Sequence, residues 1–159
     1  MKTIYPLVPK STARLEPGQF WAFPIRGKAY ACGVVLQLVT INGKKDNRSF
    51  IAGLLNWTGT KKPIGDDLKD CEVLEHGQAH IKSIVETGGE ILGKIPWKES
   101  RLEIPLSLNE SPGRNCMLRR GNEILGKASS KQQKELEVFG TWGFKFISRL
   151  AEKHFANVA

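Results

Sequence analysis

The chain has 159 residues, of which 40% are hydrophobic and 25% charged, and its 24 Lys and Arg against 16 Asp and Glu give a net charge of +8. This length and composition predict a single folded domain over 1–159 and exclude collagen-like, coiled-coil and disordered classes. The charge makes an acidic partner the first class of ligand to consider.

The N-terminal third has the pattern of an antiparallel meander. The turn signal Pro17-Gly18 precedes a run of aromatic and branched residues typical of a half-buried strand. A hairpin loop at 26–28 leads into a long apolar strand, in which Gly33 marks a bulge or a tight bend. A polar turn at 42–47 then precedes a third apolar run. The predicted strands cover 19–25, 29–40 and 49–57.

The middle of the chain fits neither period cleanly, and residues 66–90 are the hardest to assign. Residues 78–87 carry apolar side chains at helical spacing and predict either a short helix closed by Gly88-Gly89 or, the alternative we favour, a strand in a bent sheet. Two strands are expected at 90–96 and 102–108, the second at a sheet edge because Pro105 lacks an N–H. Residues 116–125 predict a hairpin around Gly121-Asn122.

The C-terminal part is expected to be helical. Large apolar residues recur at three-, four- and five-residue steps from Trp142 onward, which predicts an amphipathic helix packed on the sheet. Ser129 or Ser130 would cap an earlier helical turn over 131–139 that ends at Gly140. The fold class is therefore α+β and β-dominated: an N-terminal antiparallel meander, SH3-like or barrel-like, with a C-terminal amphipathic helix packed on it.

Cysteine usage and hydropathy predict the compartment. Cys32, Cys71 and Cys116 are an odd number of cysteines at wide spacing, which favours buried thiols in a reducing environment over disulfides. The first ten residues lack the apolar core of a secretion signal, and no apolar run reaches the ~20 residues that span a bilayer. We therefore expect a cytoplasmic protein without membrane contact.

One pair of histidines has the spacing of a metal motif. His76 and His80 are four residues apart and would share one face of a helix, with Asp66 and Asp67 as further ligands of a divalent metal. Gly77 weakens this interpretation, because it disfavours a helix and stands where a metalloprotease helix carries Glu. Hydrogen-bonded or solvated histidines are the preferred interpretation, so we predict neither a cofactor nor a catalytic residue.

Binding residues are sought among exposed cations and tryptophans. Three basic doublets lie in predicted turns and could form one face, but no helix-turn-helix, zinc-finger or ribonucleoprotein motif accompanies them, and solvated loops are the preferred interpretation. Nucleic acid is therefore not the favoured partner. Trp21 and Trp142 are expected in the core, whereas Trp57 and Trp97 adjoin turn residues and should be partly exposed. The predicted partner-binding residues are Trp57, Trp97, Lys44, Lys45, Lys61, Lys62, Arg119 and Arg120.

At the opening of the chain a Pro-Gly leads into an aromatic strand that ends in Pro, and a return strand with the pattern Tyr-x-x-Gly-x-Val follows. This opening resembles that of the immunity-26 family, small bacterial proteins that are often also named HocA-type phosphotriesterases. The similar segments are 17–25, 27–35, Gly53-Leu54-Leu55, 88–96 and Trp142-Gly143, so the likeness extends over nearly the whole chain.

The resemblance implies an immunity protein of a bacterial polymorphic-toxin system, which binds a cognate toxin and neutralises it by occluding its active site. Such a mechanism requires no catalytic residues. The basic net charge of the chain further predicts that the toxin surface is acidic. Two alternatives stay open: a metal-dependent organophosphate triester hydrolase that holds its metal through His76, His80, Asp66 and Asp67, and a basic SH3-like module that binds nucleic acid.

Overall fold

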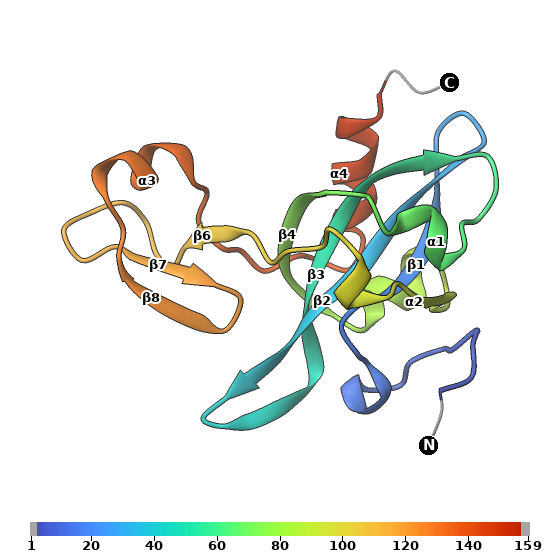
Figure 1. Ribbon diagram of the computed structural model, residues 1–159, viewed down its shortest axis with the longest axis horizontal. Coiled ribbons are helices and arrows are strands. Elements are labelled where there is room, and N and C mark those ends of the chain that lie inside the picture. The colour runs from blue at the N-terminus through green and yellow to red at the C-terminus, as the bar shows by residue number, and fades with distance from the viewer. Residues whose placement is uncertain (1–2, 157–159) are drawn as a thin grey trace.

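Two antiparallel sheets organise the computed structural model, which describes residues 3–156 (Figure 1). The larger sheet has the strand order β4-β3-β2-β1-β5, and a smaller sheet beside it has the order β6-β7-β8. This β-dominated α+β fold with a C-terminal helix confirms the predicted fold class. The strands are β1 (Gln19–Ile25), β2 (Ala29–Ile41), β3 (Lys44–Gly59), β4 (Val73–His80), β5 (Gly93–Lys94), β6 (Leu106–Leu108), β7 (Met117–Arg120) and β8 (Glu123–Lys127).

The helices are short and lie at the periphery of the sheets (Figure 1). No helix in the described part of the chain is long and apolar enough to cross a membrane. The helical elements are η1 (Thr12–Arg14), α1 (Gly65–Leu68), α2 (Lys82–Thr87), η2 (Trp97–Glu99), α3 (Ser130–Glu135) and α4 (Phe146–His154).

The β1–β3 meander follows the sequence prediction closely. β1 has the predicted bounds, whereas β2 and β3 are longer than expected. Asn42 and Gly43 both adopt positive φ (51° and 77°) and form a two-residue turn, which suits the right-handed twist of the flanking strands. Residues 44–47 therefore belong to β3 instead of to the turn, and Lys44 and Lys45 pair with β2.

Gly33 combines a bulge with a close packing contact. The pairing of β2 with β3 shifts register between Ala31 and Gly33, which confirms the predicted irregularity. The missing side chain leaves room for the ring of Trp21, whose benzo carbons occupy the position of a Cβ at residue 33. Trp21 is fully buried, and its indole N–H donates to Thr87 Oγ1 at 3.0 Å. The glycine is thus a packing requirement of the core.

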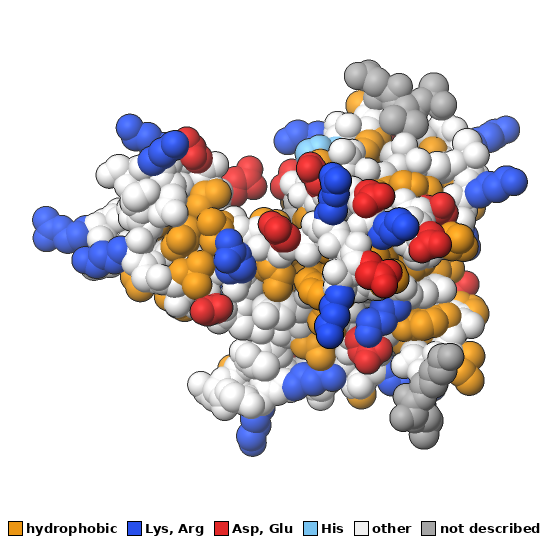
Figure 2. Space-filling view, viewed as in Figure 1, with side chains coloured by type: hydrophobic (Ala, Val, Ile, Leu, Met, Phe, Trp, Pro, Cys, Tyr) orange, Lys and Arg blue, Asp and Glu red, His pale blue; other side chains and the backbone are white. Residues whose placement is uncertain are grey.

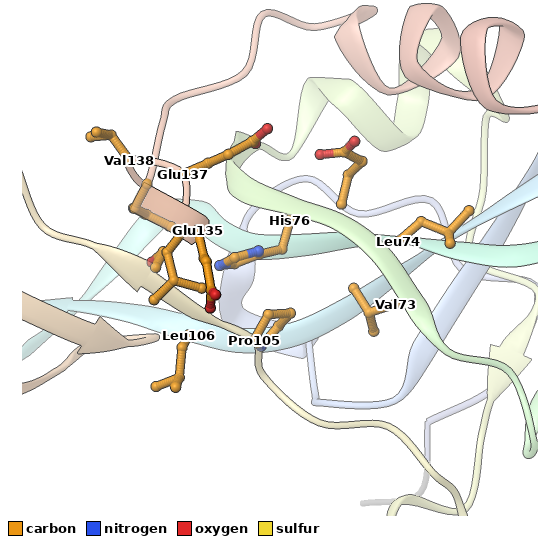
Figure 3. Close-up of a pocket in the computed structure, with 12 residues that line it drawn as sticks. Val73, Leu74, His76, Pro105, Leu106, Glu135, Glu137 and Val138 are labelled. Atoms are coloured by element: carbon orange, nitrogen blue, oxygen red, sulfur yellow. The ribbon is translucent and has the colours of Figure 1, made fainter. Parts of the chain in front are cut away.

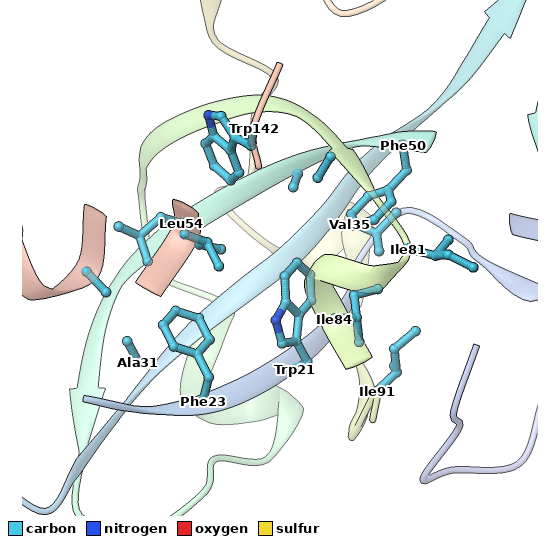
Figure 4. Packing of buried hydrophobic residues seen from close by; sticks show 14 of the residues in the cluster. Trp21, Phe23, Ala31, Val35, Phe50, Leu54, Ile81, Ile84, Ile91 and Trp142 are labelled. Atoms are coloured by element: carbon cyan, nitrogen blue, oxygen red, sulfur yellow. The ribbon is translucent and has the colours of Figure 1, made fainter. Parts of the chain in front are cut away.

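Both faces of the larger sheet are covered. α2, α4 and the N-terminal segment pack on one face, where Trp21, Phe23, Phe50 and Ile84 lie close together (Figure 4). α1 and the segment 95–104 cover the other face. Because a strand buried on both faces needs apolar residues at successive positions, β2 is a nearly continuous apolar run. Cys32 and Cys116 are buried and Cys71 is half-buried, all as free thiols, as predicted.

The middle of the chain combines the two alternatives for 78–87. β4 ends at His80, and α2 follows and ends at Thr87 with Gly88 as its C-cap. The strand expected at 90–96 shrinks to β5 and a bridge between Leu7 and Ile91. The strand expected at 102–108 shrinks to β6, because the ladder begins only after Pro105, which lacks an N–H to donate.

The two C-terminal helices are shorter than predicted because residues 137–142 are extended. Ser129 caps α3 through a reciprocal capping box with Gln132, but α3 ends at Glu135. α4 packs on the sheet as expected, although it begins at Phe146 instead of Trp142. In both cases, residues that the helical spacing predicts to be helical are extended instead, because they pair with a strand.

The extended segment 137–142, called the strap below, joins the two sheets. On one side Leu108 of β6 donates to Glu137 O at 2.9 Å and accepts from Phe139 N at 2.8 Å. On the other side Gln78 of β4 donates to Gly140 O at 2.9 Å and accepts from Trp142 N at 2.8 Å. A second link holds the β7–β8 turn on β2, where Asn122 Nδ2 donates to Leu38 O at 2.7 Å. The smaller sheet is therefore fixed to the larger one at two places.

Candidate functional site

A cavity of about 290 Å³ lies between the two sheets, next to the strap (Figure 3). It is lined by residues 73–76, 105–107 and 135–139, which come from β4, β6 and its lead-in, the end of α3 and the strap. A second cavity of about 600 Å³ shares Val73 and Pro105 with the first. The two neighbouring cavities are together called the interlobe cleft below.

The interlobe cleft is acidic although the chain is basic. Glu75, Glu135 and Glu137 line the first cavity, and Glu72 and Glu103 line the second. Figure 2 shows acidic side chains on both sides of the notch between the smaller and the larger part of the molecule. Arg101 also lines the second cavity and lies 4.0 Å from Asp70. The local field of the cleft therefore favours a cation.

Two polar atoms of residues that line the first cavity have no hydrogen-bond partner in the described part of the chain. They are His76 Nε2 and the hydroxyl oxygen of Ser107, a side chain that is only 2% exposed. A buried polar atom without a partner carries a desolvation penalty of about 1–3 kcal/mol. A ligand that reaches either atom would supply the missing hydrogen bond.

His76 is held in its neutral form. Burial lowers the pKa of His76, and the charge of Arg119 lowers it further, while Glu75 acts in the opposite direction. The ring of His76 packs on Phe139 with 5.5 Å between the centroids, and the Arg119 guanidinium lies 4.1 Å from the centroid of Phe139. At neutral pH the imidazole therefore presents a donor or an acceptor without a positive charge.

Glu75 links the cleft to the C-terminal helix. Its carboxylate lies 2.8 Å from His154 Nε2 on α4. Among residues 3–156, Glu135 and Glu137 form no ion pair, and both are exposed. In the first cavity, the negative charge available to a ligand therefore comes mainly from these two glutamates.

The predicted basic doublets do not form one face. Lys44 and Lys45 lie at the tip of the β2–β3 hairpin, whereas Lys61 and Lys62 follow the opposite end of β3. Sixteen residues of strand separate these ends, which is roughly 50 Å at ~3.3 Å per residue. The expectation of a single basic face is therefore wrong.

The arginine doublet divides into a structural and an exposed member. Arg119 is half-buried, donates to Gly121 O at 2.7 Å and 3.0 Å, and donates to Asn109 Oδ1 at 3.2 Å. Arg120 is exposed and precedes the turn that docks on Gln37 through Asn122 N at 2.8 Å. Arg119 thus holds the smaller sheet together, and Arg120 is the member available to a partner.

The tryptophans lie as predicted. Trp21 and Trp142 are buried, whereas Trp57 and Trp97 are half-buried against the α1 side of the larger sheet. Trp57 packs over Gly59. Trp57 and Trp97 retain exposed edges that a partner could contact.

The alternative metal ligands are spread over different elements. His76 and His80 lie on a strand, not on a helix, because Gly77 pairs with Ala52 of β3. Four residues of strand place the two histidines ~13 Å apart along one face, with His80 against Phe144 at 5.2 Å. Asp66 and Asp67 lie in α1, where Asp67 Oδ2 accepts from Ile64 N at 3.0 Å. Within residues 3–156, no three His, Cys, Asp or Glu side chains gather as a metal site.

Ser107, Glu135 and Glu137 were not predicted as site residues. His76, Ser107 and the segment with Glu135 and Glu137 are distant from one another in the chain, and the pairing of the strap with both sheets brings them to one cavity. The acidic excess of residues 61–100, with 8 acidic against 6 basic residues, covers Glu72 and Glu75 of the cleft, but none of the three missed residues lies in that segment.

The buried, neutral state of His76 predicts a pH-dependent stability. A histidine whose pKa is lowered by folding binds its proton more tightly in the unfolded chain, so stability is lost as the pH falls below the ordinary value near 6.5. We expect the wild type to lose more unfolding free energy between pH 7.5 and pH 5.5 than the His76→Gln variant does. Urea unfolding at both pH values measures the difference. Equal losses would show that protonation of His76 is not coupled to folding.

None of the protein-family models, curated proteins or solved structures compared with this chain matches it.

Proposed function

We propose that this chain is an immunity-type protein of the bacterial cytoplasm that binds a toxin and neutralises it by covering its active site. The observation that carries the proposal is the interlobe cleft, a concave and polar surface whose two walls are fixed by the strap. A rigid concave surface suits recognition of a protein by occlusion, because little order has to be gained on binding.

Exposed cations add a contact for an acidic toxin surface. Lys44 and Lys45 project at the hairpin tip, and Arg120 precedes the β7–β8 turn, which docks on β2 near the same end. Lys61 and Lys62 lie at the far end of β3. A standard interface covers about 800 Å² on each partner, a patch too small to include both ends of that strand. The proposed interface therefore includes Lys44, Lys45 and Arg120 and leaves out Lys61 and Lys62.

The hydrolase alternative receives no comparable support. It requires His76, His80, Asp66 and Asp67 to converge on one metal, whereas these residues lie on β4 and α1 as described. The nucleic-acid alternative requires a continuous basic surface, and the two lysine doublets lie at opposite ends of β3.

Co-expression with a toxic product of a neighbouring gene tests the proposal. We expect the chain to restore growth and to co-purify with that product. Lys44→Glu with Lys45→Glu should weaken binding at least tenfold, because reversed charges would repel an acidic surface. Raising the salt from 50 to 500 mM should weaken the wild-type complex as well. Titration calorimetry or surface plasmon resonance measures both effects.

The matched control is Lys61→Glu with Lys62→Glu, which makes the same change in net charge at the other end of β3. We expect this variant to bind within twofold of the wild type. Equal weakening by the two double variants would show a general charge effect instead of a local interface. Failure to restore growth with every neighbouring product would contradict the immunity function itself.

A further inference from the structure

We infer that the interlobe cleft is a receptor for a guanidinium group, presented by an arginine side chain of the bound partner. The inference rests on the proposed function for the identity of that partner. It concerns the chemistry of the cleft itself, which the basic net charge of the chain does not suggest. The cavity beside His76 and the acidic residues around it are the structural basis (Figure 3).

The cavity offers acceptors to a ligand that is rich in donors. Glu135 and Glu137 bring carboxylates without an ion pair in the described part of the chain, and Ser107 Oγ lacks a hydrogen-bond partner in an almost completely buried side chain. His76 Nε2 also lacks a partner and accepts a hydrogen bond in one tautomer of the neutral ring. A guanidinium carries five N–H donors and no acceptor, so it can satisfy several such groups at once.

The size and the charge of the cavity select the same group. A volume of about 290 Å³ lies at the lower limit of ligand pockets and suits one long side chain better than a large organic ligand. A lysine ammonium would also be attracted, but it is more strongly hydrated and has only three donors at one nitrogen. The planar guanidinium costs less to dehydrate than an ammonium. Its donors are spread over three nitrogens, so they can serve acceptors on both walls of the cleft.

Two basic side chains near the first cavity are already engaged. Arg119 is held by Gly121 O and Asn109 Oδ1 and lies over Phe139. His154 is bonded to Glu75. These contacts leave the carboxylates of Glu135 and Glu137 to an incoming cation.

The test uses Nα-acetyl-arginine amide as the probe and its uncharged isostere, Nα-acetyl-citrulline amide, as the control ligand. Titration of isotope-labelled full-length protein, followed by NMR, should give saturable shifts in the backbone amides of His76, Ser107 and Glu137. We expect the citrulline compound to bind at least tenfold more weakly. Equal binding of the two compounds, or shifts that avoid these residues, would overturn the inference.

Variants separate the cleft from the rest of the surface. Glu135→Gln with Glu137→Gln should weaken binding of the arginine probe at least tenfold, and Ser107→Ala should weaken it several-fold. Glu86→Gln, at an exposed position on α2, changes one charge outside the cleft and should bind as the wild type does. A Glu86→Gln effect as large as that of the double variant would contradict a specific receptor.

The same variants keep the two proposals apart. Suppose that the wild type neutralises its toxin, that the double glutamine variant neutralises it equally well, and that the arginine probe leaves the cleft unperturbed. The guanidinium receptor is then refuted while the immunity function stands. If the probe binds in the cleft but no toxin is neutralised, the receptor chemistry stands and the immunity function is refuted.

Discussion

Replacing Gly33 by alanine is expected to lower the free energy of unfolding by about 3 kcal/mol, because the new methyl group would overlap the ring of Trp21. Trp21 cannot move aside at low cost. It is fully buried against the core and its indole N–H is bonded to Thr87. Thermal and urea unfolding of the variant measure the loss of stability.

Two further variants define the cause of that loss. Gly113→Ala is the control, because the nearest atom to its added methyl group is Ser111 O at 4.0 Å, and its stability should stay within ~0.5 kcal/mol of the wild type. Adding Trp21→Phe to Gly33→Ala should cost less than the sum of the two single changes, because a smaller ring relieves the overlap. Strict additivity would show that the contact between residues 21 and 33 is not the cause.

Replacing Gly77 by alanine is expected to lower the free energy of unfolding by about 2 kcal/mol and to disturb the interlobe cleft. The added methyl group would overlap the indole nitrogen of Trp142. Trp142 is held in place by its backbone N–H, which donates to Gln78 O, so a shift of its ring would pull on the strap. We expect loss of stability together with changed NMR shifts at Glu137 and Phe139.

The neighbouring strand supplies a matched control for this change. A methyl group at Gly53 would meet only side-chain carbons of Leu36 and Val73 at 3.0 Å and of Val34 at 3.2 Å. Such atoms can shift by a few tenths of an ångström, so Gly53→Ala should cost about 1 kcal/mol and leave the strap unchanged. If Gly53→Ala changes the NMR shifts of Glu137 and Phe139 as strongly as Gly77→Ala does, the packing of the Trp142 ring on Gly77 does not position the strap.

The meander was predictable because its signals are local. Pro17-Gly18, the 26–28 loop and Asn42-Gly43 separate apolar runs that are long enough to identify as strands. The buried positions of Trp21 and Trp142 followed from similar reasoning. What local pattern could not supply was the extent of each strand, since the ladder continues wherever a partner strand is available.

The strap and the cleft were not predictable from local pattern. Residues 137–139 follow a capped helix and have helical spacing, yet they pair with Leu108, because backbone hydrogen bonds to an existing strand outweigh a weak intrinsic preference. The spacing of His76 and His80 is equally ambiguous, since residues four apart share a face in a helix and in a strand. Tertiary pairing decides both cases.

The strap also separates the shape of the cleft from its chemistry. The strap fixes the two walls of the cleft relative to each other through four main-chain hydrogen bonds. These bonds do not depend on the side chains of Glu135 and Glu137. Residues at these two exposed positions can therefore be exchanged for others while the backbone keeps the same opening. Variants of this chain with the same framework would then bind different ligands through substitutions at a few lining positions, without a change of fold.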